Sequence, residues 1–434
     1  MTKRAATTDG GDSGEKRQRS AQTLKIVAWN VNSLRALWRF GDGDGTTLKS
    51  LIAREDPDVL FLSETKLDTD GVMELLGVPK PKKTKGRKKK ADENADTGGK
   101  DIRSFFGGPR ANETASAEES RPAAKEADLL PGYRAVWNHC KIKKGYSGTA
   151  VLLKTSVAAL DAAAVAMDGL EFVPRTEELG EKEEVKVPDE ERLNGEGRVI
   201  TVDVGTCFLV HTYVPNSGQK LEKVGYRTQV WDTAMHAHLR KLHGEKPVLW
   251  MGDLNVVRGE VDVYDKLKRT RNKSPGCSDI EREVFGRLVG GLPAETHPTQ
   301  LRSKNLPEHG QSVPGPPAEE VDFVDVFRHF HPYEQTNDEG ESAEASKQSQ
   351  KSEADGSKDG SGAEEAPEEP KTLEESPFTF WSARRGERNY YNGWRLDYCI
   401  ASKSLLEGGA IKEYFHRPTV HGSDHVPIGV VLEL

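Results

Sequence analysis

Polar side chains that could bind a metal ion or move a proton stand at the ends of apolar segments in this 434-residue chain. The segment LKIVAWNV is closed by Asn30 and Asn32, whose spacing of two places both amides on one face of a strand. Asp253 and Asn255 follow PVLWMG in the same spacing. Open α/β sheets bind their ligands at the ends of strands, so these positions are candidate site residues.

Other apolar segments adjoin residues of the same kind, namely Glu64, Tyr213, Asn216, Asp397, Asp424 and His425. Each group alone could be an ordinary turn, where Asn and Asp are favoured, but so many on one domain indicate a shared site. Carboxylate and amide oxygens are the ligands that Mg²⁺ prefers, and a set with one imidazole and no thiol argues against zinc. A histidine with a separate carboxylate to orient it completes the equipment for metal-assisted phosphoryl transfer to water.

The elements that must position these residues indicate one α/β domain. Apolar, β-rich segments predict strands over 24–31, 57–65, 133–140, 149–154, 199–214, 247–256, 321–327, 378–381, 395–402 and 426–434. Helices are expected over 46–55 and near 225–243 and 279–290. Buried-looking strands that alternate with helices are typical of an α/β layer structure.

Charged or low-complexity segments interrupt this domain. We expect a disordered tail over 1–23, a single domain over 24–434, and insertions within it at 79–130, 171–198 and 337–376. The tail and the insertions together account for the whole net charge of −8, so the remaining core is neutral. A neutral core binds a polyanion only through a local basic face.

Composition argues against several classes of protein. No apolar run approaches the roughly 18 residues of a membrane helix, and the first twenty residues lack the apolar stretch of a secretory signal. The four cysteines lie far apart with no CxxC, which argues against a zinc ribbon and favours a reducing compartment. We therefore expect a soluble intracellular protein without membrane contact.

An ordered series of motifs carries a family resemblance. The series is WNVNSLRA (29–36), SETK (63–66), GYSG (145–148), TYVPNSG (212–218), GDLNV (252–256), SPGCSDIERE (274–283), GWRLDY (393–398) and GSDHVPI (422–428). It resembles the exonuclease III-type apurinic/apyrimidinic endonucleases of the endonuclease/exonuclease/phosphatase superfamily, over about 24–434 without the insertions. The resemblance implies a four-layered α/β sandwich in which two mixed β-sheets are flanked by helices.

The resemblance also implies roles for the candidate residues. Glu64 would be the principal Mg²⁺ ligand, with Mn²⁺ as a possible substitute, and Asp253 would orient or deprotonate the attacking water. His425 would bond a phosphate oxygen while Asp397 fixes its tautomer. The full implied metal set is Asn30, Asn32, Glu64, Asp253, Asn255, Asp424 and His425, and the implied catalytic set is Tyr213, Asp253, Asn255, Asp397 and His425. Asn216 would touch the scissile phosphate together with Tyr213.

Substrate selection is implied for a separate loop, 378–398, which interleaves aromatic residues with arginines. Phe380, Trp394 and Leu396 would line a small apolar pocket that accepts a flipped sugar without a base, although ordinary core packing is the alternative reading. Arg384 replaces a methionine of animal-type relatives and would enter the minor groove. The residues implied to hold the DNA backbone are Arg35, Lys66, Tyr146 and Asn272.

Two departures from the family pattern qualify these roles. Asn32 stands where some relatives have a metal-binding Asp, which would weaken or redistribute metal affinity. Val27 stands at the position of the animal enzyme's redox cysteine, so no redox regulation is carried over.

The predicted function is therefore Mg²⁺-dependent hydrolysis of duplex DNA 5′ to abasic sites in base excision repair, with 3′-phosphodiesterase or exonuclease activity as a possible addition. The alternatives are a phosphoesterase of the same fold that acts on RNA or on phospholipid or inositol phosphates, and a non-enzymatic nucleic-acid-binding scaffold. We expect a monomer whose partners are abasic duplex DNA and other base excision repair proteins. The basic run 80–90 predicts a nuclear location, with a DNA-binding arm or a solvated loop as alternatives.

Overall fold

The computed structural model describes residues 22–41, 45–75, 130–172, 188–289, 322–332 and 372–434. Of the segments expected to be disordered or inserted, 1–21, 79–129, 173–187 and 337–371 lie outside the described residues, as does the basic run 80–90. In the described part of the chain, no helix is long and apolar enough to cross a membrane.

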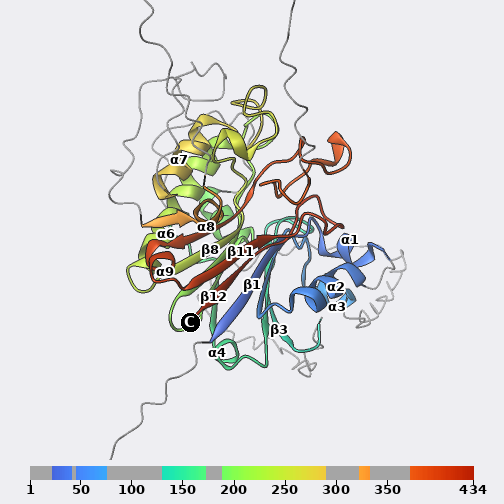
Figure 1. Ribbon diagram of the computed structural model, residues 1–434, viewed down its shortest axis with the longest axis vertical. Coiled ribbons are helices and arrows are strands. Elements are labelled where there is room, and N and C mark those ends of the chain that lie inside the picture. The colour runs from blue at the N-terminus through green and yellow to red at the C-terminus, as the bar shows by residue number, and fades with distance from the viewer. Residues whose placement is uncertain (1–21, 42–44, 76–129, 173–187, 290–321, 333–371) are drawn as a thin grey trace, which may run out of the picture.

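The described residues form two six-stranded mixed sheets (Figure 1). In the first, the strand order is β11 (Ile411–His416), β12 (Ile428–Glu433), β1 (Thr23–Asn30), β2 (Val59–Ser63), β4 (Thr149–Lys154) and β3 (Tyr133–Asn138). In the second, it is β5 (Ala164–Met167), β6 (Val199–Asp203), β7 (Phe208–Tyr213), β8 (Val248–Asp253), β10 (Asp397–Ser402) and β9 (Phe323–Asp325). Among the strands of these two described sheets, only the central pairs β1–β2 and β7–β8 are parallel.

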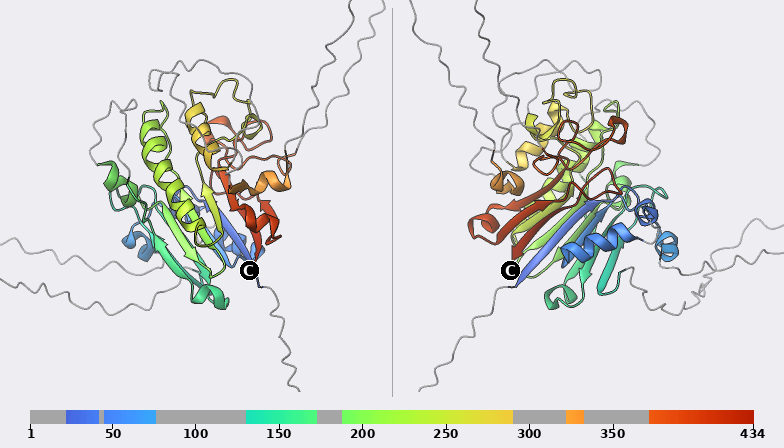
Figure 2. Two further views of the ribbon diagram at one scale, coloured as in Figure 1. Left: turned by 90° about the vertical axis from the view of Figure 1, so that its left-hand side faces the viewer. Right: turned by 45° about the vertical axis from the view of Figure 1, so that its right-hand side comes forward.

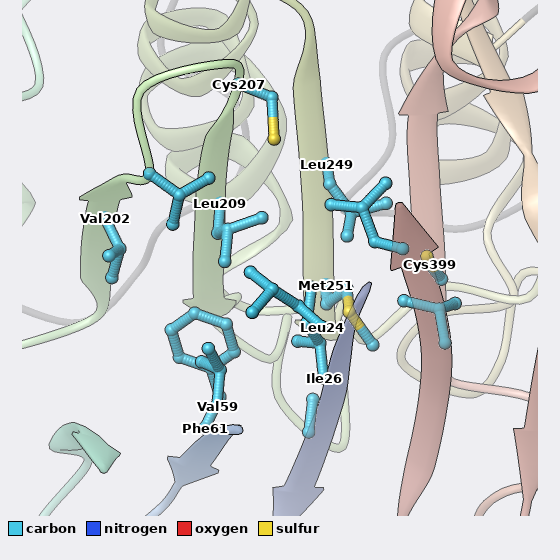
Figure 3. Packing of buried hydrophobic residues seen from close by; sticks show 14 of the residues in the cluster. Leu24, Ile26, Val59, Phe61, Val202, Cys207, Leu209, Leu249, Met251 and Cys399 are labelled. Carbon is cyan, nitrogen blue, oxygen red and sulfur yellow. The ribbon is translucent and has the colours of Figure 1, made fainter. Parts of the chain in front are cut away.

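The two sheets pack face to face through a shared apolar core. Figure 3 shows side chains of β1 and β2, such as Ile26 and Phe61, opposite those of the second sheet, such as Leu209 and Met251. The central strands are apolar on both faces because each sheet is also covered on its outer side. This explains why β1 and β2 appear in the sequence as continuous apolar runs.

Helices complete the outer layers, giving the four-layered sandwich that was predicted (Figure 2). Against the first sheet pack α1 (Leu34–Arg39), α2 (Thr46–Glu55) and α3 (Thr69–Leu75). Against the second sheet pack the π-helix η1 (Tyr226–Trp231), α6 (Asp232–His243) and α7 (Asp279–Val289). The short helices α4 (Ala158–Asp161), α5 (Asp189–Gly195), α8 (Val326–Phe330) and α9 (Lys403–Glu407) lie in the connections.

Several sequence predictions of elements need correction. The strand expected over 199–214 is two antiparallel strands, β6 and β7, joined by a turn with Gly205 at φ +90°. The segment 378–381 is no sheet strand and forms only isolated bridges through Phe380. The insertion expected over 171–198 extends too far, because α5 lies within it, Leu193 is buried in the core and Arg198 is fully enclosed.

Strand register brings the candidate residues together at one end of the sandwich. In the second sheet, Asp253 is paired with Tyr213 on one side and with Asp397 on the other. In the first sheet, Asn30 is paired with Ser63, the residue before Glu64. The polar residues that follow these strands therefore meet where the two sheets approach each other.

Candidate active site

Asn30 joins the two sheets at the centre of the candidate site. Its side-chain amide Nδ2 donates to Asp253 Oδ2 at 2.8 Å and to Glu64 Oε1 at 3.0 Å. Its Oδ1 accepts from the backbone N–H of Asn32 at 3.0 Å, which fixes the amide orientation. One carboxamide thus holds two carboxylates from different sheets within reach of each other.

Asp253 is 1% exposed and lies at the end of β8. Its Oδ1 accepts from the backbone N–H of Asn255 at 2.9 Å. Burial raises the pKa of Asp253 to about 7; His425 opposes this rise, and the carboxylate of Asp397 adds to it. A carboxyl group with a pKa near neutrality can accept and return a proton at physiological pH, as a general base must.

His425 lies between two carboxylates. Its Nδ1 is 2.8 Å from Asp397 Oδ2, and its Nε2 is 3.8 Å from Asp253 Oδ2. Burial would lower the pKa of His425, but the charges of Asp397 and Asp253 outweigh burial and raise the pKa to about 10. The imidazole therefore carries a proton at neutral pH and can donate it in a hydrogen bond to an anionic oxygen.

A second group of oxygens gathers around a lysine beside this pair. Lys66 Nζ donates to Glu64 Oε2 at 2.8 Å and to Asn32 Oδ1 at 2.6 Å. Asn32 Nδ2 in turn donates to Asp424 Oδ1 at 3.0 Å. Burial opposes ionisation of Glu64, yet Lys66 lowers the pKa of Glu64 below its ordinary value. Lys66, which the resemblance assigns to the DNA backbone, here belongs to this oxygen cluster.

The donor set fits a hard divalent cation. Carboxylate and amide oxygens from Glu64, Asn32 and Asp424 form a group that already attracts the ammonium of Lys66. Asp253, Asp397 and His425 offer ligand atoms within 4.8 Å of one another. The residues present can therefore hold a metal ion of the kind that hydrolytic nucleases use.

Left-handed backbone conformations aim several of these side chains. Asn32, Glu64, Lys66 and Asn255 have φ values between +43° and +52°. Non-glycine residues rarely adopt such φ values, and the accompanying strain is characteristic of functional sites. Here it turns the chain sharply at the strand ends, so that consecutive polar residues face the same site.

An apolar group of side chains adjoins the histidine. The Phe380 ring centroid lies 4.8 Å from that of His425 and 6.2 Å from that of Trp394, in the latter case edge to face. Leu396 and Trp394 are buried in one cluster with the residues Val257, Val263, Leu267 and Cys277. The structure thus brings together the three residues that the resemblance assigns to a pocket, and Phe380 among them contacts His425.

The remaining predicted residues fall into different places. Tyr213 is buried at the end of β7, and Asn216 donates from Nδ2 to Asn255 Oδ1 at 3.1 Å, so both adjoin the site. Arg384 is exposed on the 3₁₀ turn η4 (Ala383–Arg385). Asn272 is not brought to the cluster, because its amide caps α7 through two 2.8 Å hydrogen bonds to Asp279.

Two predicted contacts with DNA already have partners within the chain. Arg35 pairs with Glu74 at 3.4 Å on the surface. The hydroxyl of Tyr146 accepts a 2.8 Å hydrogen bond from Arg198 Nη2. Exposed ion pairs are weak and exchange readily, so the Arg35 side chain can still turn to a phosphate.

Arg198 is a site residue that the sequence analysis missed. Its guanidinium donates to the backbone carbonyl of Tyr213 at 2.9 Å, and it lies over the Tyr213 ring at 4.7 Å. Glu196 balances its charge at 2.6 Å. Arg198 therefore connects Tyr146 with Tyr213. The available signal was the pair Glu196–Arg198 directly before an apolar strand, which was hidden by its assignment to a charged insertion.

Comparisons with known proteins agree with this geometry. The chain is 26% identical over 412 residues to a DNA-(apurinic or apyrimidinic site) endonuclease of Dictyostelium discoideum, covering 95% of this chain and 71% of that protein. It is 27% identical to an exodeoxyribonuclease of Bacillus subtilis, covering 95% of this chain and 100% of that protein. The crystal structure of an AP endonuclease from Leishmania major has the same fold, with a TM-score of 0.54 at 23% identity, covering 95% of this chain and 88% of that one.

Residues 27–425 match the model of a hydrolytic enzyme family that comprises metal-dependent nucleases. This match extends over most of the chain and contains every candidate site residue. The chain belongs to the Endonuclease/Exonuclease/phosphatase family.

Proposed function

We propose that this protein is a Mg²⁺-dependent DNA repair endonuclease that hydrolyses the phosphodiester bond 5′ to abasic sites in duplex DNA. The observation that carries the proposal is the position of the apolar group Phe380, Trp394 and Leu396 directly beside the Asp253–His425 pair. A sugar bound in that group would hold its 5′ phosphate near the acid–base pair.

The residues of this chain divide the work of hydrolysis between them. Asp253, with its raised pKa, takes a proton from the attacking water as the water oxygen bonds to phosphorus. The bond from phosphorus to the 3′ oxygen of the preceding nucleotide breaks, and that oxygen leaves as a 3′-hydroxyl after it takes up a proton from solvent. His425, protonated and held by Asp397, donates a hydrogen bond to a non-bridging phosphate oxygen. Stabilisation of the charge that develops on phosphorus is usually the largest single contribution in such sites.

Glu64 would hold Mg²⁺ together with Asn30, Asn32 and Asp424. When bound, the ion polarises the phosphate and neutralises its charge. Hard oxygen donors in this number support Mg²⁺ over zinc, and they also accommodate Mn²⁺. Lys66 would leave Glu64 and Asn32 as the metal enters, and its ammonium would then be free to contact a DNA phosphate.

The apolar group beside His425 would supply selectivity for damage. Extrusion of a nucleotide costs a few kcal/mol and costs least where base stacking is already lost. Phe380 and Trp394 would pack against the bare sugar, and their bulk would exclude a nucleotide that retains its base. The name of the Dictyostelium discoideum relative, an apurinic/apyrimidinic site endonuclease, supports this choice of substrate.

A second candidate activity is the removal of nucleotides from DNA ends. It is favoured by the Bacillus subtilis relative, which is named an exodeoxyribonuclease and is covered over its full length. The same acid–base pair and metal would serve both reactions, because each hydrolyses a phosphodiester bond.

The proposal is tested by the choice of substrate. Initial rates are compared on an abasic duplex, the matched intact duplex, a recessed 3′ end, poly(A) and an inositol phosphate, all with Mg²⁺. We expect the abasic duplex to react at least tenfold faster than any other substrate. Faster hydrolysis of poly(A) or of the inositol phosphate would reject it in favour of the corresponding same-fold phosphoesterase.

We also propose a nuclear location, on the basis of the sequence KPKKTKGRKKK at 80–90. Replacement of its lysines by glutamines in a fluorescent fusion of the full chain should move the protein out of the nucleus. A fusion that stays nuclear after this change would refute the role of the run.

A further inference from the structure

Arg388 makes an unusual set of contacts for a guanidinium group. It donates from Nη1 to the backbone carbonyls of Pro418 and Val420, at 3.1 and 2.5 Å. It donates from Nη2 to the carbonyl of Ser423 and, at 3.2 Å, to that of His425. All four acceptors lie in one stretch, 418–425, which we name the catalytic segment because it ends in Asp424 and His425.

Arg388 itself belongs to a different stretch, 382–393, which we name the substrate loop because it carries the exposed Arg384 and lies next to Phe380 and Trp394 in the chain. Trp381, which directly precedes the substrate loop, contacts Arg388 and its neighbour Asn389. The Arg388 guanidinium lies over the Trp381 ring at 5.5 Å, and the Trp381 indole N–H donates to the Asn389 carbonyl at 2.9 Å. The guanidinium of Arg388 therefore connects the substrate loop to the catalytic segment through hydrogen bonds.

The same segment is attached to the first sheet on its other side. Ser423 Oγ donates to the Asn30 carbonyl at 2.7 Å, and the Trp29 indole N–H donates to the His425 carbonyl at 3.1 Å. The His425 carbonyl thus accepts from both Trp29 and Arg388. These two hydrogen bonds fix the backbone of His425, and the backbone sets the direction of the His425 side chain. Arg388 donates one of the two hydrogen bonds.

Only arginine suits this position. A planar guanidinium directs its N–H groups in a fixed fork and can reach carbonyls on two sides at once. A lysine carries its three N–H groups on one nitrogen, so it cannot span from Pro418 to His425. In the described part of the chain, the hydrogen bonds of Arg388 all go to backbone carbonyls, so its function here is to shape the backbone.

We propose that Arg388 is a positioning residue that sets the geometry of Asp424 and His425 and couples it to the substrate loop. The proposal rests on the proposed function, since it concerns hydrolysis of DNA at this site. DNA bound to the exposed arginines would restrict the motion of the substrate loop. The hydrogen bonds of Arg388 would then restrict the motion of the catalytic segment. A shift of about 1 Å in such a segment is enough to lower a rate about 10²-fold.

The test is Arg388→Ala assayed on abasic duplex DNA with and without added guanidinium ion. We expect kcat to fall about 10- to 100-fold while KM changes less than about threefold, because the substrate contacts remain. Guanidinium at about 20 mM should restore at least a tenth of the lost kcat, and tetramethylammonium at the same concentration should not. Arg240→Ala on α6, an exposed arginine remote from the site, is the matched control and should behave as wild type.

A second readout does not depend on turnover. The Val426 N–H donates to the Thr379 carbonyl and the Trp381 N–H to the Asp424 carbonyl, both at 2.9 Å. These amides therefore report whether the residues directly before the substrate loop stay paired with the end of the catalytic segment. Hydrogen exchange at both should accelerate at least tenfold in Arg388→Ala, while Val27 in β1 keeps its wild-type rate.

The outcomes separate this proposal from the proposed function. If wild type cleaves abasic DNA, a folded Arg388→Ala variant with wild-type kcat, or one that guanidinium does not rescue, overturns the positioning role. If Arg388→Ala does not fold, Arg388→Lys is measured instead. We expect its kcat to be at least fivefold lower than that of wild type, and an unchanged kcat would contradict the proposal. If wild type fails to cleave abasic DNA, the proposed function fails, and the exchange rates alone decide whether Arg388 holds the segment.

Discussion

Asp397 Oδ2 lies 2.8 Å from Nδ1 of His425, although 28 residues separate them in the chain. The contact joins the first residue of β10 to the residues that precede β12, and so it joins the two sheets of the sandwich. The carboxylate fixes the orientation of the imidazole ring, so that the other ring nitrogen, Nε2, lies 3.8 Å from Asp253 Oδ2. The chemistry of the site therefore depends on how the two sheets are packed.

Replacement of Asp397 should remove the carboxylate that orients the imidazole of His425. In Asp397→Asn, the amide can donate to Nδ1, so His425 loses its orienting anion and its stabilised positive charge. We expect kcat on abasic DNA to fall at least 10²-fold with little change in the affinity for DNA. Steady-state kinetics and a gel-shift titration measure the two quantities, and a kcat within threefold of wild type would contradict the role.

Replacement of Asp253 should remove the proton acceptor. Asp253→Asn keeps the hydrogen bond from the backbone N–H of Asn255 but can no longer take a proton from water, so the rate should fall at least 10²-fold. Asp203→Asn on β6, which weakens an ion pair with Lys246 while an oxygen remains for the Gly205 N–H, is the control and should retain full activity. Equal activity of the two variants would exclude Asp253 as the base.

Glu64 should determine the Mg²⁺ concentration that cleavage requires. Glu64→Gln removes a charged ligand, and we expect the Mg²⁺ concentration for half-maximal cleavage to rise at least tenfold, with partial recovery by Mn²⁺. Glu171→Gln, a change to an exposed carboxylate, serves as the control. An unchanged Mg²⁺ dependence in Glu64→Gln would place the metal on other residues.

Phe380 should determine how strictly intact DNA is rejected. Phe380→Ala enlarges the space beside His425 and removes the ring that packs against Trp394. We expect the ratio of kcat/KM for abasic over intact duplex to fall at least tenfold. Phe330→Ala, at a partly exposed position on α8, controls for loss of an aromatic ring. A ratio that stays at the wild-type value would assign Phe380 to packing alone.

Glu55 should make stability depend on pH. Burial raises its pKa, but hydrogen bonds from Arg417, Lys25 and Arg54 outweigh burial and lower the pKa to about 2. The carboxylate therefore stabilises the fold above pH 4.5, and this contribution is lost as the pH falls from 4.5 through 2.

Glu55→Gln should lower the free energy of unfolding at pH 7 by about 1–2 kcal/mol, and the difference from wild type should shrink toward pH 3. Urea unfolding at both pH values measures it. Glu171→Gln, which loses only an exposed pair with Lys241, should show no such difference. If the difference in the free energy of unfolding between Glu55→Gln and wild type grew toward pH 3, the prediction would be contradicted.

The sequence predicted the framework of the fold because its central strands are long apolar runs. The strand expected over 149–154 is β4 without change, and the helix over 46–55 is α2. The strands β5 and β11 went unrecognised, since β5 is a short edge strand with Met167 48% exposed and β11 mixes Lys412 and Glu413 with buried aromatics. Edge strands carry weak periodicity, and their pairing depends on a neighbour that is distant in sequence.

The candidate site was predictable where its members lie at strand ends. Asn30 and Asp253 follow directly from the rule that ligands bind at the carboxyl ends of strands. Asp397 begins β10 and reaches the site because β10 runs antiparallel to β8. Arg198 and Arg388 could not be found this way, because their value lies in contacts with backbone carbonyls that only the folded chain assembles. Lys66 was predicted to hold the DNA backbone, and its pairing with Glu64 depends on a left-handed turn that sequence patterns do not reveal.

A proposed metal site on the first sheet, beside an apolar group that would receive a baseless sugar, is the feature on which the proposed function depends. Its most direct test is the mapping of cuts on an end-labelled duplex with one abasic site, in Mg²⁺ and in EDTA. We predict a single cut 5′ to the lesion in Mg²⁺, leaving a 3′-hydroxyl and a 5′-deoxyribose phosphate, and no cut in EDTA. Equal cleavage in both solutions, or cuts scattered along the undamaged strand, would contradict the account.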